Sequence, residues 1–237
     1  MNWKGIILAA GDATRMPNKH LLPIKQDLFA IESSIRLLTS SCINDIIIVI
    51  REDSLLPKIL PQRFAGWPRF KYVVQGKDVK KSYFHAVWTA IMGSRLHDDS
   101  NASVCITCCD NIYPEDERVN KDALYQCSSD LLLCTRMFPI DIAKHLTTFD
   151  STASWTRGII DATNIAEYQL THGYECFAGY AMAKNLKGFM KTVQHAIGYG
   201  AGTEAVLNAL KALPLNVPAA GWFDIGTPET YAKYWNE

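Results

Sequence analysis

The chain has 237 residues, of which 48% are hydrophobic and 20% charged, and its 24 basic and 24 acidic residues give a net charge of zero. This composition fits one α/β domain over residues 1–237 with a sizeable core. The lack of basic blocks argues against a nucleic-acid partner, and the lack of a run of about 18 apolar residues argues against a membrane span. Because no charged leader precedes Trp3, we expect a cytoplasmic protein.

The seven cysteines are scattered along the chain, and both their odd number and their spacing are atypical of a disulfide framework. Cys105 and Cys108 have the spacing of a zinc-ligand pair, but no second Cys or His pair lies at a suitable distance. Both residues lie in the apolar run 104–109. We therefore interpret these cysteines as small buried side chains.

The first half of the chain alternates between strand and helix patterns. Continuous apolar and β-branched runs predict buried strands at residues 6–8, 46–50, 70–74 and 104–109. Helical spacing of apolar residues predicts helices over 27–39 and, capped by Ser82, over 83–96. The proline-rich stretch 55–67 predicts a loop with a short helix. This alternation is typical of a doubly wound parallel sheet.

The second half is less regular. Helices are predicted over 114–125, 188–196 and 203–213, and short strands, some of them antiparallel, over 131–135, 147–149, 157–165 and 176–183. Residues 221–226 predict a strand and a turn that enter a last helix, in which Thr227 is the cap and Pro228 lies in the first turn.

A loop of small residues follows the first predicted strand. Residues 9–14 are small or short, and two cations, Arg15 and Lys19, come next. Small residues allow an anion to approach the backbone N–H groups closely. Arg15 could fork onto phosphate oxygens, and Lys19 could add a point charge. The pattern indicates polyphosphate binding; an ordinary turn beside a solvated surface is the alternative.

Two carboxylates stand at positions where ligands are often bound. Asp110 directly follows a predicted strand, and ligands of open parallel sheets bind beyond the carboxyl ends of the strands. Asp110 should therefore share an edge with the Gly11 loop. Asp224 precedes the turn at Gly226 near the end of the chain. Each aspartate could instead serve only as a turn residue.

Three segments resemble the nucleotidyltransferases that make activated sugars and related phospho-compounds. Residues 8–24 resemble their N-terminal signature, Cys109-Asp110-Asn111 resembles their Gly-Asp-Asn, and residues 222–229 (WFDIGTPE) resemble their W-x-D-I-G-T-P-E segment. Three departures stand out: Ala13 replaces a glycine, Asn18 replaces a proline and Cys109 replaces a glycine. The short Arg15–Lys19 spacing is nearer to that of the small cytidylyl- and molybdenum-cofactor guanylyltransferases.

The resemblance implies a three-layer α/β/α fold with a mostly parallel, Rossmann-like sheet, as in nucleotide-diphospho-sugar transferases of the GT-A type, and a small antiparallel extension on the acceptor side. It also implies Mg²⁺ held by Asp110 and Asp224, and catalytic roles for Arg15 and Lys19. The nucleotide-binding residues that it implies are Leu8, Ala10, Gly11, Asp12, Ala13, Thr14, Gln75, Gly76 and Ser82.

The acceptor side is less well defined. Residues 177–180 resemble the strand that lines the family's acceptor pocket, which makes Gly179 a candidate contact. Hexose-1-phosphate members carry a Glu-Lys-Pro segment, and the nearest stretch here, residues 164–168, lacks its lysine. Candidates for the missing phosphate contact, each of which could instead be a surface residue, are Trp155, Arg157 and Lys184.

We therefore predict a nucleotidyltransferase that transfers an NMP from an NTP, with CTP slightly favoured, to a phosphorylated sugar or small phospho-alcohol. Pyrophosphate would be released, and the product would feed glycan or capsule precursor synthesis. One alternative is a glycosyltransferase of the related fold, although Asp98-Asp99 matches its Asp-x-Asp motif poorly. Another is a non-catalytic nucleotide-binding relative. The sequence leaves open whether copies of the chain form a homo-oligomer.

Overall fold

The protein is described by a computed structural model, which covers residues 2–11, 16, 18–76, 82–143, 146–150, 153–157, 173–218 and 220–236. Within these ranges, no helix combines the length and the apolar character needed to cross a membrane.

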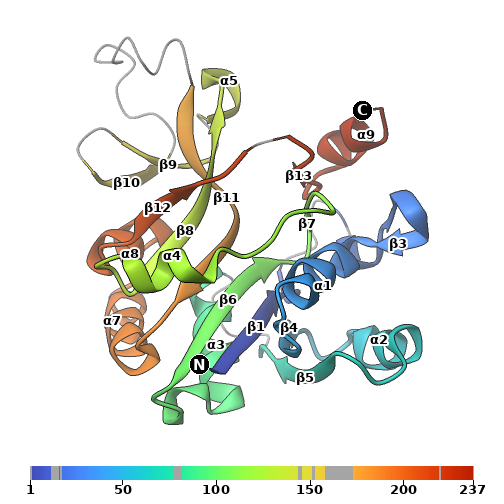
Figure 1. The fold of residues 1–237 in the computed structure, drawn as a ribbon, viewed down its shortest axis with the longest axis horizontal. Helices are drawn as coiled ribbons and strands as arrows, with labels where there is room; N and C mark the ends of the chain where they lie inside the picture. Colours follow the sequence, from blue (N-terminus) through green and yellow to red (C-terminus); the bar gives the residue numbers. More distant parts are fainter. Residues whose placement is uncertain are drawn as a thin grey trace.

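A nine-stranded sheet runs through the molecule in the order β10-β9-β11-β6-β1-β4-β5, and β8 pairs with both β11 and β12 (Figure 1). Its parallel part consists of β1 (Asn2–Leu8), β4 (Asp45–Ile50), β5 (Arg69–Val74) and β6 (Ala102–Cys108). The crossovers between these strands contain the predicted helices. This parallel part confirms the strand–helix alternation expected for the first half of the chain.

An antiparallel extension adjoins β6. The long strand β11 (Tyr174–Ala183) lies antiparallel to β6 and to β8 (Leu131–Phe138). β9 (Thr147–Phe149) and β10 (Trp155–Arg157) continue this part of the sheet, while β12 (Leu213–Asn216) runs parallel to β8. The predicted fold class, a parallel α/β sheet with an antiparallel extension, is confirmed.

Helices cover both faces of the sheet. One face packs against α1 (Ala30–Ser40), α2 (Leu56–Phe64) and α4 (Lys121–Gln126). The other packs against α3 (Tyr83–Ser94), α7 (Leu186–Gly198) and α8 (Thr203–Ala209). The last helix, α9 (Pro228–Asn236), and the short α5 (Ile140–Ala143) lie outside these two layers (Figure 1).

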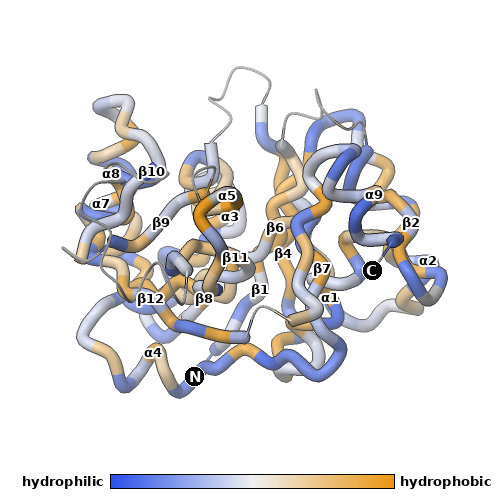
Figure 2. Tube along the Cα trace, turned by 90° about the horizontal axis from the view of Figure 1, so that it is seen from above, coloured by the Kyte–Doolittle hydropathy of each residue, from blue (hydrophilic) through white to orange (hydrophobic). Residues whose placement is uncertain are grey.

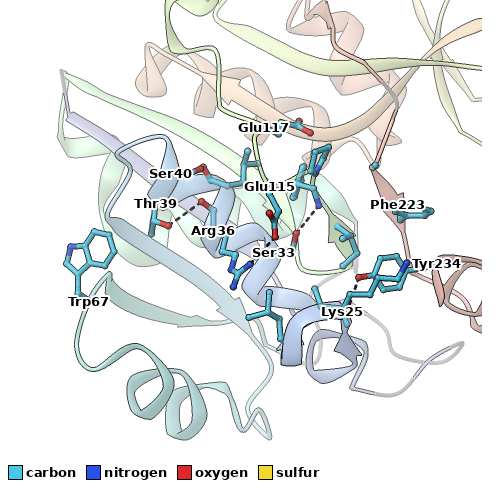
Figure 3. A pocket seen from close by; sticks show the side chains of 17 residues that line it. Lys25, Ser33, Arg36, Thr39, Ser40, Trp67, Glu115, Glu117, Phe223 and Tyr234 are labelled. Carbon is cyan, nitrogen blue, oxygen red and sulfur yellow. Dashed lines mark hydrogen bonds and ion pairs between the residues drawn. The ribbon is translucent and has the colours of Figure 1, made fainter. Parts of the chain in front are cut away.

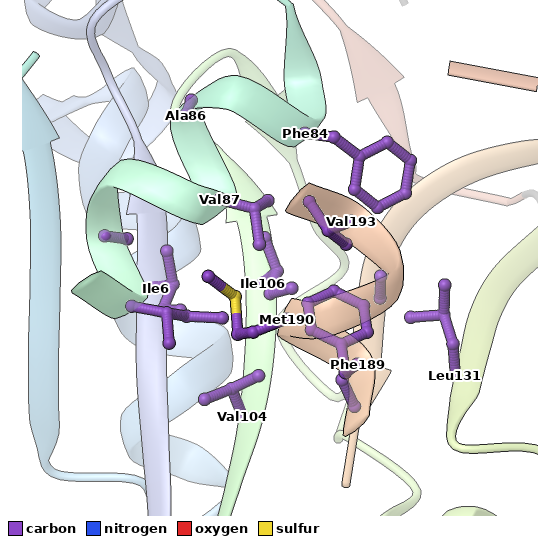
Figure 4. Packing of buried hydrophobic residues seen from close by; sticks show 14 of the residues in the cluster. Ile6, Phe84, Ala86, Val87, Val104, Ile106, Leu131, Phe189, Met190 and Val193 are labelled. Atoms are coloured by element: carbon purple, nitrogen blue, oxygen red, sulfur yellow. The ribbon is translucent and has the colours of Figure 1, made fainter. Parts of the chain in front are cut away.

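Strand alternation explains the two-sided core. On β1, Ile6 belongs to the core cluster under α3 and α7, and Ile7 belongs to the cluster under α1 and α2. Figure 4 shows Ile6 and Ile106 packed against Val87 of α3 and Met190 of α7. Because both faces are covered, β4 is apolar from Ile46 to Ile50, and β6 is buried from Ala102 to Thr107 although it includes two hydroxyl residues (Figure 2).

Two predicted helices were wrong in part. Residues 114–120 are not helical: α4 begins only at Lys121, and Asn120 is its cap. The non-helical segment lies along α1 instead, where its ends are held by serine side chains. Tyr113 N donates to Ser33 Oγ (2.8 Å) and Val119 N donates to Ser41 Oγ (2.9 Å).

The helix expected over 203–213 ends at Ala209, and the chain then enters strand β12. Lys211 has φ of 51°, in the left-handed region, and ends the helical path. Pro214 fits a strand that pairs with a single neighbour, because it has no N–H to donate. The prediction for the C-terminus was correct: Thr230 N donates to Thr227 Oγ1 (3.2 Å), and Pro228 opens α9.

A buried ion pair joins the antiparallel extension to the segment before α4. Arg136, on β8, is 1% exposed, and its Nη2 donates to both carboxylate oxygens of Glu117 at 2.6 and 2.7 Å. Its Nε donates to Ala178 O (3.2 Å), its Nη1 donates to Pro218 O, and its guanidinium lies 5.5 Å from the ring centre of Trp222.

Removing one member of this pair should destabilise the fold strongly. We expect Glu117→Leu to lower the free energy of unfolding by about 3–5 kcal/mol, because it leaves a buried guanidinium without its counter-ion. Urea unfolding measures the change. The control is Lys4→Met, which breaks the more exposed pair with Asp45 and should cost no more than about 1 kcal/mol. Equal losses in the two variants would contradict the expectation.

Candidate active site

The parallel strands end together at one edge of the sheet, and the chain leaves that edge in three places. Ala9 N donates to Val49 O (2.9 Å), Gln75 N donates to Ile50 O (2.9 Å) and Cys109 N donates to Leu8 O (3.2 Å). These bonds extend the ladders by one residue beyond the strands. The loops that start at Ala9, Gln75 and Cys109 therefore begin side by side, at the edge where open α/β sheets bind ligands.

Asp110 and Asp224 meet at this edge. The short strands β7 (Asn111–Ile112) and β13 (Phe223–Asp224) pair in antiparallel fashion, with Asp224 opposite Asn111, and Ile225 N donates to Asp110 O (2.9 Å). This ladder brings the end of the chain against the loop after β6. The convergence of the two aspartates that was expected from the sequence is therefore present in the structure.

Gly226 lies between the two carboxylates. A Cβ atom built on Gly226 would be 2.9 Å from Asp224 Oδ1 and 3.3 Å from Asp110 Oδ2, while Gly226 N donates to Asp224 Oδ1 (2.8 Å). Any larger residue would therefore push at least one carboxylate away. From the sequence, Gly226 was predicted only to form a turn. Its position two residues after Asp224 was the sequence feature that could have indicated a place in the site.

Lys19 contacts one of these carboxylates. It opens the 3-10 turn η1 (Lys19–Leu21), and its Nζ donates to Asp110 Oδ2. Burial alone would lower the pKa of Lys19, but the Asp110 carboxylate outweighs this effect and holds that pKa well above its ordinary value. Lys19 is therefore a permanent cation that partly neutralises the two aspartates.

The turn before Lys19 explains one departure from the family pattern. Asn18 has φ of 52°, in the left-handed region. Proline cannot adopt this conformation, because its ring fixes φ near −65°, whereas Asn tolerates it. The replacement of the expected proline is thus a consequence of the local backbone. Cys109, the other replaced position near the site, is 2% exposed and packs in the core.

The structure describes the first residues of the predicted phosphate loop, 9–11, but not those that follow. Ala10 is buried, whereas Gly11 is exposed and has no atom within 4 Å of a Cβ built on it. Among the described residues, none occupies the space over Gly11. The predicted residues Asp12, Ala13, Thr14 and Arg15 lie outside the described residues.

Gln75 and Ser82 flank a second loop at the same edge. The Gln75 side chain is 7% exposed, and its Nε2 has no hydrogen-bond partner within the described part of the chain. A buried amide donor without a partner is unfavourable, so a ligand or water at this edge would stabilise it. Gly76 is exposed, and Ser82 caps α3 by accepting from His85 N (3.4 Å) while its Oγ lies 2.6 Å from His85 Nδ1.

The predicted acceptor residues do not gather at one place. Gly179, in the irregular part of β11, has φ of 126°, and a Cβ there would lie 3.1 Å from Cys134 Sγ, so packing and backbone conformation explain the glycine. Trp155 is a core residue rather than a surface one, 2% exposed, and its Nε1 donates to Ala212 O (2.9 Å). Arg157 is exposed at the end of β10.

Lys184 is also unsuited to contact the acceptor phosphate. Its Nζ donates to Leu124 O (2.7 Å) and Cys127 O (3.0 Å). It directly follows Ala183, which pairs with Val104 near the start of β6, so Lys184 lies at the opposite edge of the sheet from Asp110.

The carboxylate pair fits a hard divalent cation. Among the described residues, no group of three or more His, Cys, Asp or Glu side chains is arranged to hold a metal, so a closed zinc-type site is not formed there. Asp110 and Asp224 offer oxygen ligands around the small Gly226. Mg²⁺ suits such a site, since it is commonly bound by one or two carboxylates together with substrate phosphates and waters.

A separate pocket of about 670 Å³ lies beside α1, and its lining includes Ser33, Ile112 and Phe223 (Figure 3). Ile112 and Phe223 form a pair in the β7–β13 ladder that joins the two aspartate segments. The lining includes neither Asp110 nor Asp224, so the pocket lies beside the candidate site and is not part of it.

Solved structures show the same fold. A candidate glucose-1-phosphate thymidylyltransferase from Bacillus anthracis, in complex with sucrose, superposes with a TM-score of 0.75 at 16% identity and covers 98% of this chain and 93% of its own. A CTP:phosphocholine cytidylyltransferase from Streptococcus pneumoniae gives a TM-score of 0.65 at 16% identity, with 98% and 97% covered. No protein-family model matches the chain, and no curated protein matches it by sequence.

The contact between Lys19 and Asp110 leads to a prediction about stability. Because the folded-state pKa of Lys19 is raised, its contribution is fully present below its unfolded pKa of about 10.4 and is lost only as pH rises further. We expect Lys19→Met to lower the free energy of unfolding by about 1–3 kcal/mol, by the same amount at pH 6 and at pH 9. Urea unfolding at both pH values measures it; a loss that disappears by pH 9 would contradict it.

Proposed function

We propose that the protein is a Mg²⁺-dependent nucleotidyltransferase, which transfers an NMP from an NTP to a phosphorylated sugar or small phospho-alcohol. The observation that carries the proposal is the meeting of Asp110 and Asp224 around Gly226, with Lys19 on Asp110 and the Gly11 loop at the same edge. The fold shared with a thymidylyltransferase and a cytidylyltransferase supports it.

The nucleotide would lie over the end of β1. Its phosphates would occupy the space above Gly11, where backbone N–H groups of residues 10–14, together with Arg15 and Lys19, would stabilise their charge. The base would lie over Leu8 and Ala10, near Gln75, Gly76 and Ser82. The unpartnered Gln75 Nε2 is suited to donate to a carbonyl oxygen or ring nitrogen of that base.

Asp110 and Asp224 would hold the Mg²⁺, which supplies charge stabilisation to the phosphates when bound. An oxygen of the acceptor phosphate forms a bond to the α-phosphorus of the NTP. The bond from the α-phosphorus to the bridging oxygen breaks, and pyrophosphate departs with the electron pair. The acceptor phosphate is already ionised at neutral pH, so the protein needs no general base. Its residues act by orientation and by placing positive charge.

The acceptor class is inferred from features of the sequence. The two similar structures are named as a glucose-1-phosphate thymidylyltransferase and a CTP:phosphocholine cytidylyltransferase. The chain lacks the Glu-Lys-Pro lysine of hexose-1-phosphate enzymes and has a short Arg15–Lys19 spacing, which favours CTP and a small phospho-alcohol. A product of this type would serve glycan or capsule precursor synthesis. Gly179 would contribute backbone contacts to the acceptor pocket.

The positions of Asp98 and Asp99 argue against the glycosyltransferase alternative. Asp98 and Asp99 follow α3 and precede β6, in and after the turn η3 (Leu96–Asp98), so they lie at the amino edge of the sheet, opposite Asp110. The non-catalytic alternative predicts a distinct outcome: the protein would bind an NTP in a separate binding measurement, but no pyrophosphate would be released from the NTP with any acceptor.

Neutralising either aspartate should abolish turnover. We expect Asp110→Asn and Asp224→Asn each to lower kcat by at least about 100-fold, since charge stabilisation by the metal site is worth several kcal/mol. Pyrophosphate release is measured for the four NTPs against sugar-1-phosphates and phospho-alcohols. The control is Asp45→Asn, which removes a carboxylate that is also paired with a lysine but lies at the start of β4. Near-normal turnover in both site variants would refute the proposal.

Gln75 should influence binding of the base more than the chemical step. We expect Gln75→Leu to raise the NTP KM about tenfold, as loss of one hydrogen bond to the base allows, with a smaller change in kcat. Steady-state kinetics with each NTP measures this. The matched control is Gln62→Leu on the exposed side of α2, which should change neither constant. An unchanged KM in Gln75→Leu would place the base elsewhere.

A further inference from the structure

Two adjacent serines of α1 are buried against the sheet. Ser33 is 6% exposed and Ser34 is fully buried, on a helix whose other buried positions are mostly apolar. Serine inside a helix is unfavourable relative to alanine, and a buried hydroxyl needs a hydrogen-bond partner. Both serines find theirs in the main chain on either side of Asp110.

Ser34 and Ser33 bracket the Asp110 turn. Ser34 Oγ donates to Cys108 O (3.0 Å), two residues before Asp110. Ser33 Oγ accepts from Tyr113 N (2.8 Å), three residues after it, and Figure 3 shows this bond. The turn is thus held by α1 at both its entry and its exit.

Lys19 Nζ and Asn111 Nδ2 donate to the Asp110 carboxylate itself, and two main-chain bonds anchor the backbone of the turn. Cys109 N donates to Leu8 O (3.2 Å), and Ile225 N donates to Asp110 O (2.9 Å). With the two serines, these bonds hold the turn against β1, α1 and β13. The serine bonds are side-chain contributions that can be removed singly without altering the main-chain pairing.

We propose that Ser33, assisted by Ser34, is a positioning residue for the Asp110 carboxylate. This inference rests on the proposed function, in which Asp110 binds a divalent cation. Without the Ser33 hydroxyl, Tyr113 N would be a buried donor with no partner, and the exit of the turn would relax. The pocket that Ser33 and Ile112 line gives the chain room to move. Asp110 would then lose its fixed distance from Asp224.

Ser41 provides a matched control. It lies just after α1, is also 6% exposed, and accepts from Val119 N (2.9 Å) while donating to Leu37 O (2.7 Å). Ser41→Ala therefore leaves one buried main-chain N–H unpaired, as Ser33→Ala does, but in a segment distant from Asp110. The two variants should be similarly destabilised.

The experiment compares Ser33→Ala, Ser33→Thr, Ser41→Ala and Asp110→Asn in the full chain. Mn²⁺ alone is titrated by electron paramagnetic resonance, half-saturation by Mg²⁺ is measured at saturating NTP, and thermal midpoints are recorded. We expect Ser33→Ala to weaken Mn²⁺ binding and raise the Mg²⁺ half-saturation by about tenfold or more, as loss of outer-shell partners typically does. Ser33→Thr keeps the hydroxyl and should restore both values, since the pocket accommodates its methyl group. Ser41→Ala should change the midpoint alone.

The possible failures are distinguishable. Wild-type Mn²⁺ affinity in Ser33→Ala, with binding abolished in Asp110→Asn, would overturn the positioning role and leave the proposed function intact. Wild-type affinity in Asp110→Asn would overturn the metal site itself. If Ser33→Ala does not fold, Ser34→Ala tests the other serine contact of the Asp110 turn. This variant leaves the Cys108 carbonyl, rather than an N–H, without its side-chain partner. Unchanged Mn²⁺ affinity in Ser34→Ala would also overturn the inference.

Discussion

The candidate site depends on the pairing of two very short strands, β7 and β13. The ladder between them, with Ile225 N on Asp110 O, is what places the carboxylate of Asp224 beside that of Asp110. Two carboxylates in one place repel each other, and the molecule compensates with Lys19, whose raised pKa keeps it charged. Lys19 thus offsets part of the negative charge of the two carboxylates, and the negative charge that remains favours binding of a cation.

The parallel half of the fold could be predicted from the sequence because its signals are local. Continuous runs such as 46–50 can only be strands covered on both faces, and Ser82 and Thr227 begin helices as their chemistry suggests. In the second half, the strands at 131–135, 147–149 and 176–183 were also predicted correctly, and the errors there have non-local causes. The stretch 114–120, which contains a turn, is held along α1 by hydrogen bonds to serines that lie far away in the sequence, and β12 forms by pairing with β8.

The candidate site, like the fold, could be predicted in part from the sequence. Asp110, Asp224 and Lys19 lie in segments whose sequences resemble those of a known family, and the structure brings all three together. Gly226 lies in one of the same matching segments, but its position between the two carboxylates is seen only in the structure. Ser33 lies outside those segments, and only its contact with Tyr113 N reveals it. Two candidates for the phosphate contact have other roles: Trp155 is buried in the core, and Lys184 donates to main-chain carbonyls at the opposite edge of the sheet. A single residue carries no sequence pattern that would have shown this.

The departures from the family pattern then acquire a physical meaning. Asn18 stands where the backbone is left-handed, which excludes proline, and Cys109 is buried where the chain is anchored to Leu8. Neither change removes a charge or a hydrogen-bonding group from the edge where the aspartates meet. The two superposed transferases, at 16% identity, show that very different sequences form this fold. In this chain, the two replaced positions are explained by backbone conformation and burial, and the two aspartates still meet around Gly226.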